Sequence, residues 1–211
     1  ATRDFGASVY LVDTRRKGRG DYLMELAAVY PEAYVASPYD DPWVIEGNAS
    51  LGSELARLEP TFDDLIVPIG GGGLSAGLLV GLRKMGRLIR VTGAEPLMAN
   101  DAAQSLRQGY RVVNATEPET IADGARTPSL GKLNWPILEK GLESIIEIPE
   151  STIRRAVQLL YHLGHLKVEP TGALSVAALL TAPDLFQGKK VGCIISGGNI
   201  DDDVFQQIVA Q

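Results

Sequence analysis

The stretch LIVPIGGGGLSAGLLVGL places four consecutive glycines, Gly70 to Gly73, between an apolar run and a helical pattern. Ordering a glycine costs more conformational entropy than ordering any other residue, and a simple turn needs only one or two of them. The backbone N–H groups of such a loop can converge on an anion at the start of the next helix, where the helix dipole favours negative charge. The run therefore predicts a strand, a phosphate-binding loop and a helix, in that order.

Two other interpretations of the glycine run stay open at this point. Gly71-x-Gly73-x-x-Ala76 fits the relaxed dinucleotide fingerprint, and Glu95 stands about 20 residues further on, where an acidic residue would contact a ribose. The run can also be a tight turn with no ligand, although four glycines exceed what a turn requires. A Walker A loop is excluded, because no Gly-Lys-Ser/Thr follows.

Short β-branched runs alternate with helical patterns along the chain, which predicts an α/β fold with an open, mostly parallel sheet and flanking helices. The strands are expected at Ser8–Val12, Ala33–Ala36, Leu65–Pro68, Ile89–Gly93, Ser144–Ile148 and Lys190–Ile195. The helices are expected at Tyr22–Val29, Val44–Leu58, Leu74–Met85, Asn100–Arg107, Trp135–Gly141, Ser151–Leu163, Thr171–Leu180 and Val204–Ala210. The turn formers of SPYDDP mark the expected boundary between two parts of the chain.

Composition and charge indicate which binding partners and which cellular compartment are expected. The 211 residues carry a net charge of −6, which gives no support to a nucleic-acid or anionic-membrane partner. No apolar run of about 18 residues is present, so no membrane span is expected. The single cysteine, Cys193, excludes an intrachain disulfide and fits a reducing compartment, so we expect a cytoplasmic protein.

Two further segments carry residues suited to a site. VGCIISGGNID forms a second glycine-rich loop after the last expected strand, and ligands of open parallel sheets lie outside the carboxyl ends of the strands. In VTGAEPLMAND, the carboxylates of Glu95 and Asp101 with a main-chain carbonyl can hold a hard divalent cation such as Mg²⁺ or Ca²⁺. The alternative is that Asp101 only begins a helix, where negative charge is favoured.

These segments together resemble the fold-type II pyridoxal-phosphate enzymes, in the branch of the serine/threonine dehydratases (ammonia-lyases) and serine racemases. The matching stretches, in chain order, are SPYDDPWVIEGNASLG, VPIGGGGLSAG, GAEP, ETIADGARTPSLGKLNWPIL, VEPTGA and SGGNID. Each one is modest by itself, but the ordered set covers nearly the whole chain. The resemblance implies the tryptophan-synthase-β-like fold and a pyridoxal 5'-phosphate cofactor.

The resemblance also implies a set of site residues. Gly70, Gly71, Gly72, Gly73 and Leu74 match the loop that binds the cofactor phosphate through its backbone N–H groups. Ser196 matches the serine that bonds the pyridine nitrogen, Gly124 a residue packed against the cofactor, and Glu169 the acid of the EPTGA stretch beside it. Glu95, the carbonyl of Ala99 and Asp101 match the divalent-cation site of the racemase-like members.

One departure from the family pattern concerns catalysis. The Schiff-base lysine of the family lies in a Ser-Phe-Lys motif, and none of the lysines present has that context (Lys17, Lys84, Lys132, Lys140, Lys167, Lys189 and Lys190). The Ser-x-Gly-Asn loop for the substrate carboxylate is absent as well, so no catalytic residue is assigned. We therefore expect a chain that lacks the N-terminal third of a family member, with residues 1–38 a remnant of the small domain and 39–211 most of the large cofactor domain.

The expected function is that of the C-terminal portion of a pyridoxal-phosphate-dependent enzyme. Such an enzyme eliminates the β-hydroxyl of a small β-hydroxy amino acid to give a 2-oxo acid and ammonia, or racemises serine, and we expect this chain alone to be inactive. The family suggests a homodimer, or a complementing N-terminal segment, as the partner. A nicotinamide-dependent oxidoreductase domain and a non-catalytic phosphate- or partner-binding remnant remain the alternatives.

Overall fold

The computed structural model describes residues 2–13, 16–59 and 61–210 of the chain, which divides into two compact units, Ala1–Ala36 and Ser37–Gln211. The smaller unit contains helix α1 (Arg19–Val29). The strands expected at Ser8–Val12 and Ala33–Ala36 are wrong, because neither segment forms a ladder in the described part of this unit. A strand requires a partner to bond its backbone groups, and residue preferences alone do not supply one.

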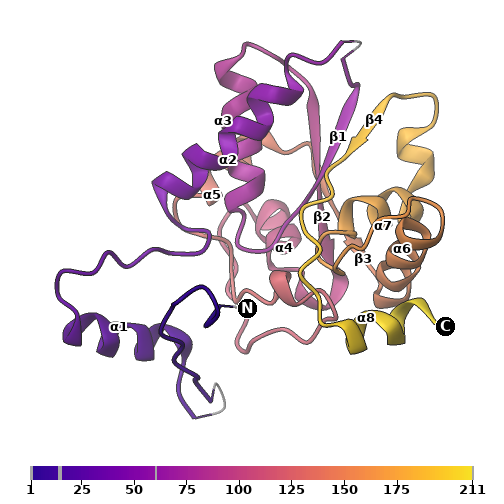
Figure 1. Ribbon diagram of the computed structural model, residues 1–211. Helices are drawn as coiled ribbons and strands as arrows, with labels where there is room; N and C mark the ends of the chain where they lie inside the picture. Colours follow the sequence, from indigo (N-terminus) through magenta and orange to yellow (C-terminus); the bar gives the residue numbers. More distant parts are fainter. Residues whose placement is uncertain (1, 14–15, 60, 211) are drawn as a thin grey trace. The chain divides into compact units, whose positions relative to one another are not determined.

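The larger unit is an α/β domain, and its elements lie close to the expected ranges (Figure 1). Its helices are α2 (Pro42–Leu55), α3 (Gly73–Lys84), α4 (Asp101–Gln108), α5 (Trp135–Gly141), α6 (Glu150–His162), α7 (Leu174–Thr181) and α8 (Asp202–Val209). Its strands are β1 (Asp64–Pro68), β2 (Arg90–Pro96), β3 (Ser144–Ile148) and β4 (Val191–Cys193), the last shorter than expected. No helix among the described residues is long and apolar enough to cross a membrane.

The four strands form one parallel sheet in the order β3-β2-β1-β4. The chain runs outward from β1 through β2 to β3 and then returns to place β4 on the other side of β1. The strand order therefore reverses between β1 and β4. In open parallel sheets, ligands bind outside the carboxyl ends of the strands at such a switch point.

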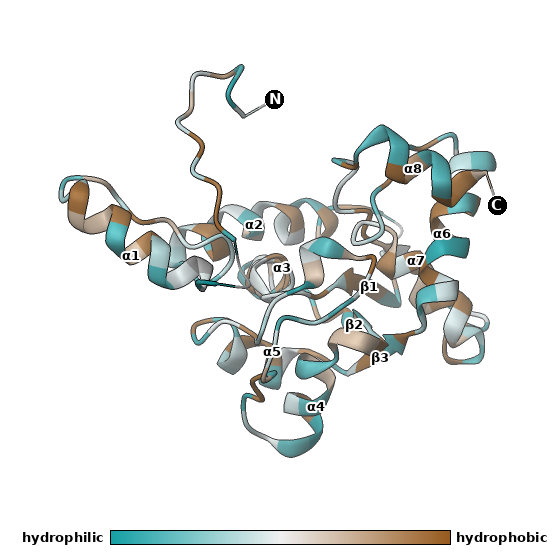
Figure 2. Cartoon of the chain, turned by 90° about the horizontal axis from the view of Figure 1, so that it is seen from below, coloured by the Kyte–Doolittle hydropathy of each residue, from teal (hydrophilic) through white to brown (hydrophobic). Residues whose placement is uncertain are grey.

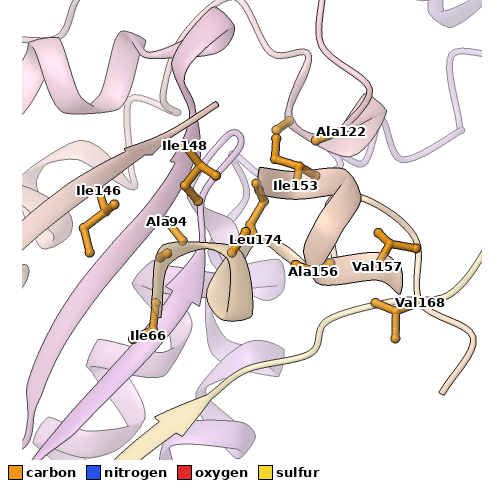
Figure 3. Close-up of a cluster of buried hydrophobic side chains, with 14 of the residues drawn as sticks. Ile66, Ala94, Ala122, Ile146, Ile148, Ile153, Ala156, Val157, Val168 and Leu174 are labelled. Atoms are coloured by element: carbon orange, nitrogen blue, oxygen red, sulfur yellow. The ribbon is translucent and has the colours of Figure 1, made fainter. Parts of the chain in front are cut away.

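Two hydrophobic clusters cover the two faces of the sheet. Alternate residues of a strand point to opposite faces, so Leu65 and Val67 belong to one cluster and Ile66 to the other. The first cluster packs the sheet against α2, α3 and α5. The second packs it against α6, α7 and α8, and Figure 3 shows Ile66, Ala94 and Ile148 meeting Ile153 and Leu174. Because both faces are covered, all five residues of β1 are buried.

The helices on these faces follow from local sequence. Helix α2 begins where Asp41 accepts a hydrogen bond from the Trp43 N–H at 2.8 Å and Pro42 occupies the first turn. Helix α8 carries both hydrophilic and hydrophobic residues (Figure 2), and it buries Phe205, Ile208 and Val209.

Candidate functional site

The glycine loop lies where the sequence places it, between the carboxyl end of β1 and the start of α3. Gly72 occupies the N-cap position of α3 with φ of 89°, a left-handed conformation that favours glycine. Within the described residues, the backbone N–H groups of Gly70 to Leu74 donate no hydrogen bond. The loop therefore presents free donors at the positive end of a helix, an arrangement suited to an anion.

The glycines are required first by the chain's own packing. A Cβ atom added at Gly71 would collide with the ring of Tyr39, and one at Gly73 would lie 2.8 Å from the Tyr39 carbonyl oxygen. A Cβ atom at Gly70 would lie 2.7 Å from the Gly124 carbonyl oxygen. The close approach that the glycine run predicts is thus made by protein atoms on at least one side of the loop.

The same contacts join the separate site segments into one region. Gly70 meets Gly124, and the Gly124 N–H donates to the Thr171 hydroxyl at 3.0 Å. The next residue, Gly172, is so close to the Gly197 carbonyl oxygen that a side chain would not fit. The structure therefore brings Gly70–Gly73, Gly124, the EPTGA segment and the SGGN loop together at the carboxyl edge of the sheet.

Glu169 holds the SGGN loop in place. Its Oε2 atom accepts the Asn199 N–H at 2.9 Å, and its own N–H donates to the Gly197 carbonyl oxygen at 3.2 Å. Burial raises the pKa of Glu169, and the nearby charge of Asp123 raises it further. The carboxylate is thus engaged with the backbone that flanks Ser196, whose exposed hydroxyl makes no hydrogen bond within the described chain.

The residues expected to hold a cation are arranged differently from a preformed metal centre. Glu95 is 1% exposed, and its two oxygens accept the N–H groups of Ala102 and Ala103, both at 2.9 Å. Glu95 therefore caps α4, and the ribose role of the dinucleotide interpretation is wrong for this buried, engaged carboxylate. No group of three or more His, Cys, Asp or Glu side chains that could hold a metal is found among the described residues.

Asp101 is the second buried carboxylate of this cluster. Its Oδ1 atom accepts the Asn114 side-chain N–H at 3.1 Å, whereas its Oδ2 atom is buried without a hydrogen-bond partner in the described chain. Burial raises the pKa of Asp101 to about 6, and burial together with the Asp101 charge raises the pKa of Glu95 well above its usual range. For both carboxyl groups, the cost of removing a charge from water outweighs the hydrogen bonds that favour the ionised form.

An open cavity of about 520 Å³ lies beside the Gly124 and Glu169 segments. It is lined by residues near Gly124 and by α6 and α8, including Asp123, Arg126, Arg154, Asn199 and Asp201. None of Gly70 to Gly73 lines it. The phosphate-binding candidate and this cavity are therefore separate features of the same edge.

Three contributors to the site were not expected from the sequence. Tyr39 packs on Gly71, Thr171 bonds Gly124, and the Asn134 side chain bonds the Gly71 carbonyl oxygen at 2.7 Å. Tyr39 and Thr171 lie inside two of the matching motifs, SPYDDP and EPTGA. The motifs therefore indicated that these residues lie near the site. Asn134 also lies in a matching stretch, but nothing local indicates its contact 63 residues away.

Comparison with known proteins agrees with this geometry. The family model described as "Pyridoxal-phosphate dependent enzyme" matches residues 1–197. An L-threo-3-hydroxyaspartate ammonia-lyase of Saccharomyces cerevisiae is 35% identical over 95% of this chain and 61% of its own length. A serine racemase of Schizosaccharomyces pombe is 32% identical over 100% of this chain and 65% of its own length.

Solved structures give the same result. The crystal structure of a T.th. threonine deaminase superposes with a TM-score of 0.84 at 33% identity, covering 94% of this chain and 65% of that one. The chain thus spans less than two thirds of the length of these relatives. Because the family model matches most of its residues, the chain belongs to the family of pyridoxal-phosphate dependent enzymes.

Proposed function

We propose that this chain is the cofactor-binding portion of a pyridoxal-phosphate-dependent ammonia-lyase or racemase that acts on a small β-hydroxy amino acid. One observation carries the proposal: the glycine loop follows β1 and Ser196 follows β4, on the two sides of the switch point of the sheet. The relatives named hydroxyaspartate ammonia-lyase, serine racemase and threonine deaminase support the substrate class. On the family alone, we also propose a homodimer in the cytoplasm.

Each residue has a defined part in this proposal. The N–H groups of Gly70 to Leu74 hold the phosphate, Gly124 packs against the ring, and Ser196 donates its hydroxyl hydrogen to the pyridine nitrogen. Glu169 fixes the loop that carries Ser196. The bound cofactor supplies an electron sink for chemistry at the substrate Cα.

The choice of serine at position 196 affects which reaction is favoured. A neutral hydroxyl would not stabilise a protonated pyridine nitrogen as a carboxylate would, so a cofactor held by Ser196 would be a weaker electron sink. Elimination suits this setting, because the leaving β-hydroxyl carries the electron pair away. We therefore favour ammonia loss over transamination.

Titration of the chain with pyridoxal 5'-phosphate, followed by visible absorbance and equilibrium dialysis, tests this function. We expect saturable binding and no single stoichiometric lysine adduct after borohydride reduction, because no lysine has the Ser-Phe-Lys context. Binding of reduced nicotinamide dinucleotide in place of pyridoxal phosphate would support the oxidoreductase alternative. Binding of neither would support the non-catalytic alternative.

The substitution Ser196→Ala tests the ring contact. We expect the affinity for pyridoxal phosphate to fall about fivefold, the effect of one net hydrogen bond of about 1 kcal/mol, with a changed absorbance spectrum of the bound cofactor. Affinity for inorganic phosphate should not change, since the glycine loop is intact. Ser50→Ala on the exposed side of α2 serves as the control. An unaltered spectrum and affinity in Ser196→Ala would remove Ser196 from the site.

We also propose a divalent cation at Asp101, with Glu95 and the Ala99 carbonyl completing its protein ligands. The buried, unpartnered Oδ2 atom of Asp101 fits a hard cation, which prefers oxygen ligands. Millimolar Mg²⁺ or Ca²⁺ should then raise the melting temperature, because a ligand that binds only the folded state stabilises it. The variant Asp101→Asn should lose this shift, with potassium chloride at equal ionic strength as control. Equal shifts in both proteins would contradict the site.

A further inference from the structure

Asn134 occupies the N-cap position of α5 but does not cap its own helix. An asparagine at this position usually accepts a hydrogen bond from the first turn, whereas the Asn134 side chain makes no such bond. Instead its Nδ2 atom donates to the carbonyl oxygens of Tyr39 at 2.9 Å and Gly71 at 2.7 Å. The residue is fully buried, so these bonds are shielded from water.

The orientation of this amide follows from its neighbours. Both neighbouring atoms are carbonyl oxygens, which accept hydrogen bonds, so the nitrogen must face them. The Asn134 Oδ1 atom is left buried without a partner in the described chain. A buried polar atom without a partner is unfavourable. The side chain nevertheless keeps this orientation, because it allows the two hydrogen bonds to Tyr39 and Gly71.

The bond to Gly71 determines where the next N–H group points. The Gly71 carbonyl oxygen also accepts the Gly131 N–H at 2.9 Å, so two donors from the α5 side hold it. A trans peptide is planar, and its C=O and following N–H point in opposite directions. The N–H of Gly72 is therefore directed away from α5.

The segment that carries Asn134 is itself fixed. The Asp40 carboxylate accepts the N–H groups of Lys132 at 2.9 Å and Leu133 at 2.8 Å. A Cβ atom added at Gly131 would lie 2.5 Å from Asp40 Oδ1 and 2.6 Å from Asn134 Nδ2, so this turn fits closely against both side chains. Three segments, around residues 40, 71 and 132, thus form one network.

We propose that Asn134 is a positioning residue that orients the Gly72 N–H for the cofactor phosphate. This inference rests on the proposed function, because it assigns a cause to the preorganisation of the same loop. It predicts that Asn134 contributes to affinity for the phosphate group and not for the pyridine ring. Preorganised donors gain their strength from needing no rearrangement when the ligand arrives.

The test compares pyridoxal 5'-phosphate with pyridoxal, which lacks the phosphate, by equilibrium dialysis in wild type and Asn134→Leu. Leucine has a similar branched shape, adds no charge near the phosphate and provides no donor. We expect the preference for the phosphorylated ligand to fall at least about tenfold, with pyridoxal binding unchanged. Without ligand, the Gly131 amide should exchange its hydrogen faster in the variant, because its acceptor is less firmly held.

A control and a second variant distinguish a specific effect on phosphate binding from a general loss of stability. Asp64→Asn alters a buried carboxylate bonded to Arg90 at the other end of β1, so it should change stability and leave the ligand preference intact. If Asn134→Leu does not fold, Gly131→Ala replaces it, because the added methyl group displaces the Asn134 side-chain amide. It should show the same loss of preference for the phosphorylated ligand. If a folded variant keeps the wild-type preference for the phosphorylated ligand, the role of Asn134 is overturned but the phosphate loop is not. A wild-type chain with no preference for the phosphorylated ligand overturns the phosphate loop, and this inference with it.

Discussion

Replacing Gly52 by alanine should lower the free energy of unfolding by about 3 kcal/mol, a large part of the stability of an ordinary domain. Gly52 lies on α2 where that helix packs directly on the backbone of α3. An added Cβ atom would collide with the Leu78 carbonyl oxygen and lie 2.9 Å from the Gly81 Cα atom. The colliding atoms belong to a helix backbone, so the two helices must separate to accommodate the methyl group.

Gly47, on the same helix, provides the matched control. It is exposed, and no atom of the described residues lies within 4 Å of the position of an added Cβ atom. Gly47→Ala should therefore stabilise the chain by about 0.5 to 1 kcal/mol through helix propensity alone. Urea denaturation of the two variants measures both effects. Destabilisation of the same size in both would show that helix contact does not explain the cost at Gly52.

The sequence predicted the parts of the site that depend on local order. A buried strand, a glycine run and an apolar helix are neighbours in the chain, so Gly70 to Gly73 could be placed between β1 and α3 without a structure. The SGGNID loop after the last strand could be placed in the same way. Parallel strands put both loops at one edge of the sheet, the edge at which open parallel sheets bind their ligands.

The parts that the sequence did not determine depend on which other element each segment meets in the fold. The β-branched residues of Ser8–Val12 favour extended backbone, but pairing with another strand decides whether a strand forms. The role of Glu95 depended likewise on the neighbouring helix α4, whose first-turn N–H groups it accepts. A carboxylate at a strand end is compatible with a ribose, a cation or a helix N-terminus, and spacing does not distinguish them.

The purpose of the glycines is a subtler case. The run predicts room for a ligand, whereas the structure shows protein atoms of Tyr39 and Gly124 close to Gly70 and Gly71. A bound ligand and a close protein neighbour both require a loop without side chains. The same run of glycines is therefore expected in either case. Only the free N–H groups of the loop distinguish a binding loop from a tightly packed turn.

Gly72→Ala should weaken binding of pyridoxal 5'-phosphate by tenfold to a hundredfold, roughly the equivalent of 1 to 3 kcal/mol of backbone strain. The φ angle of 89° at Gly72 is unfavourable for alanine, and its Cβ atom would lie 2.8 Å from Leu138 Cδ1. The loop would relieve the strain by rotating the peptides that carry the N–H donors. Stability should fall as well, since the strain is present without ligand.

Gly86→Ala separates the loss of binding from the loss of stability. Gly86 follows the other end of α3 with φ of 64°, and in the described part of the chain no atom lies within 4 Å of the position of its added Cβ atom. Alanine there carries a similar backbone strain and should lower stability by about 1 kcal/mol, but it leaves the phosphate loop unaltered. Dialysis at a temperature where both variants are folded should show weakened binding in Gly72→Ala alone. Equal binding in the two variants would mean that the Gly72 conformation does not orient the donors, and the phosphate would have to be held elsewhere.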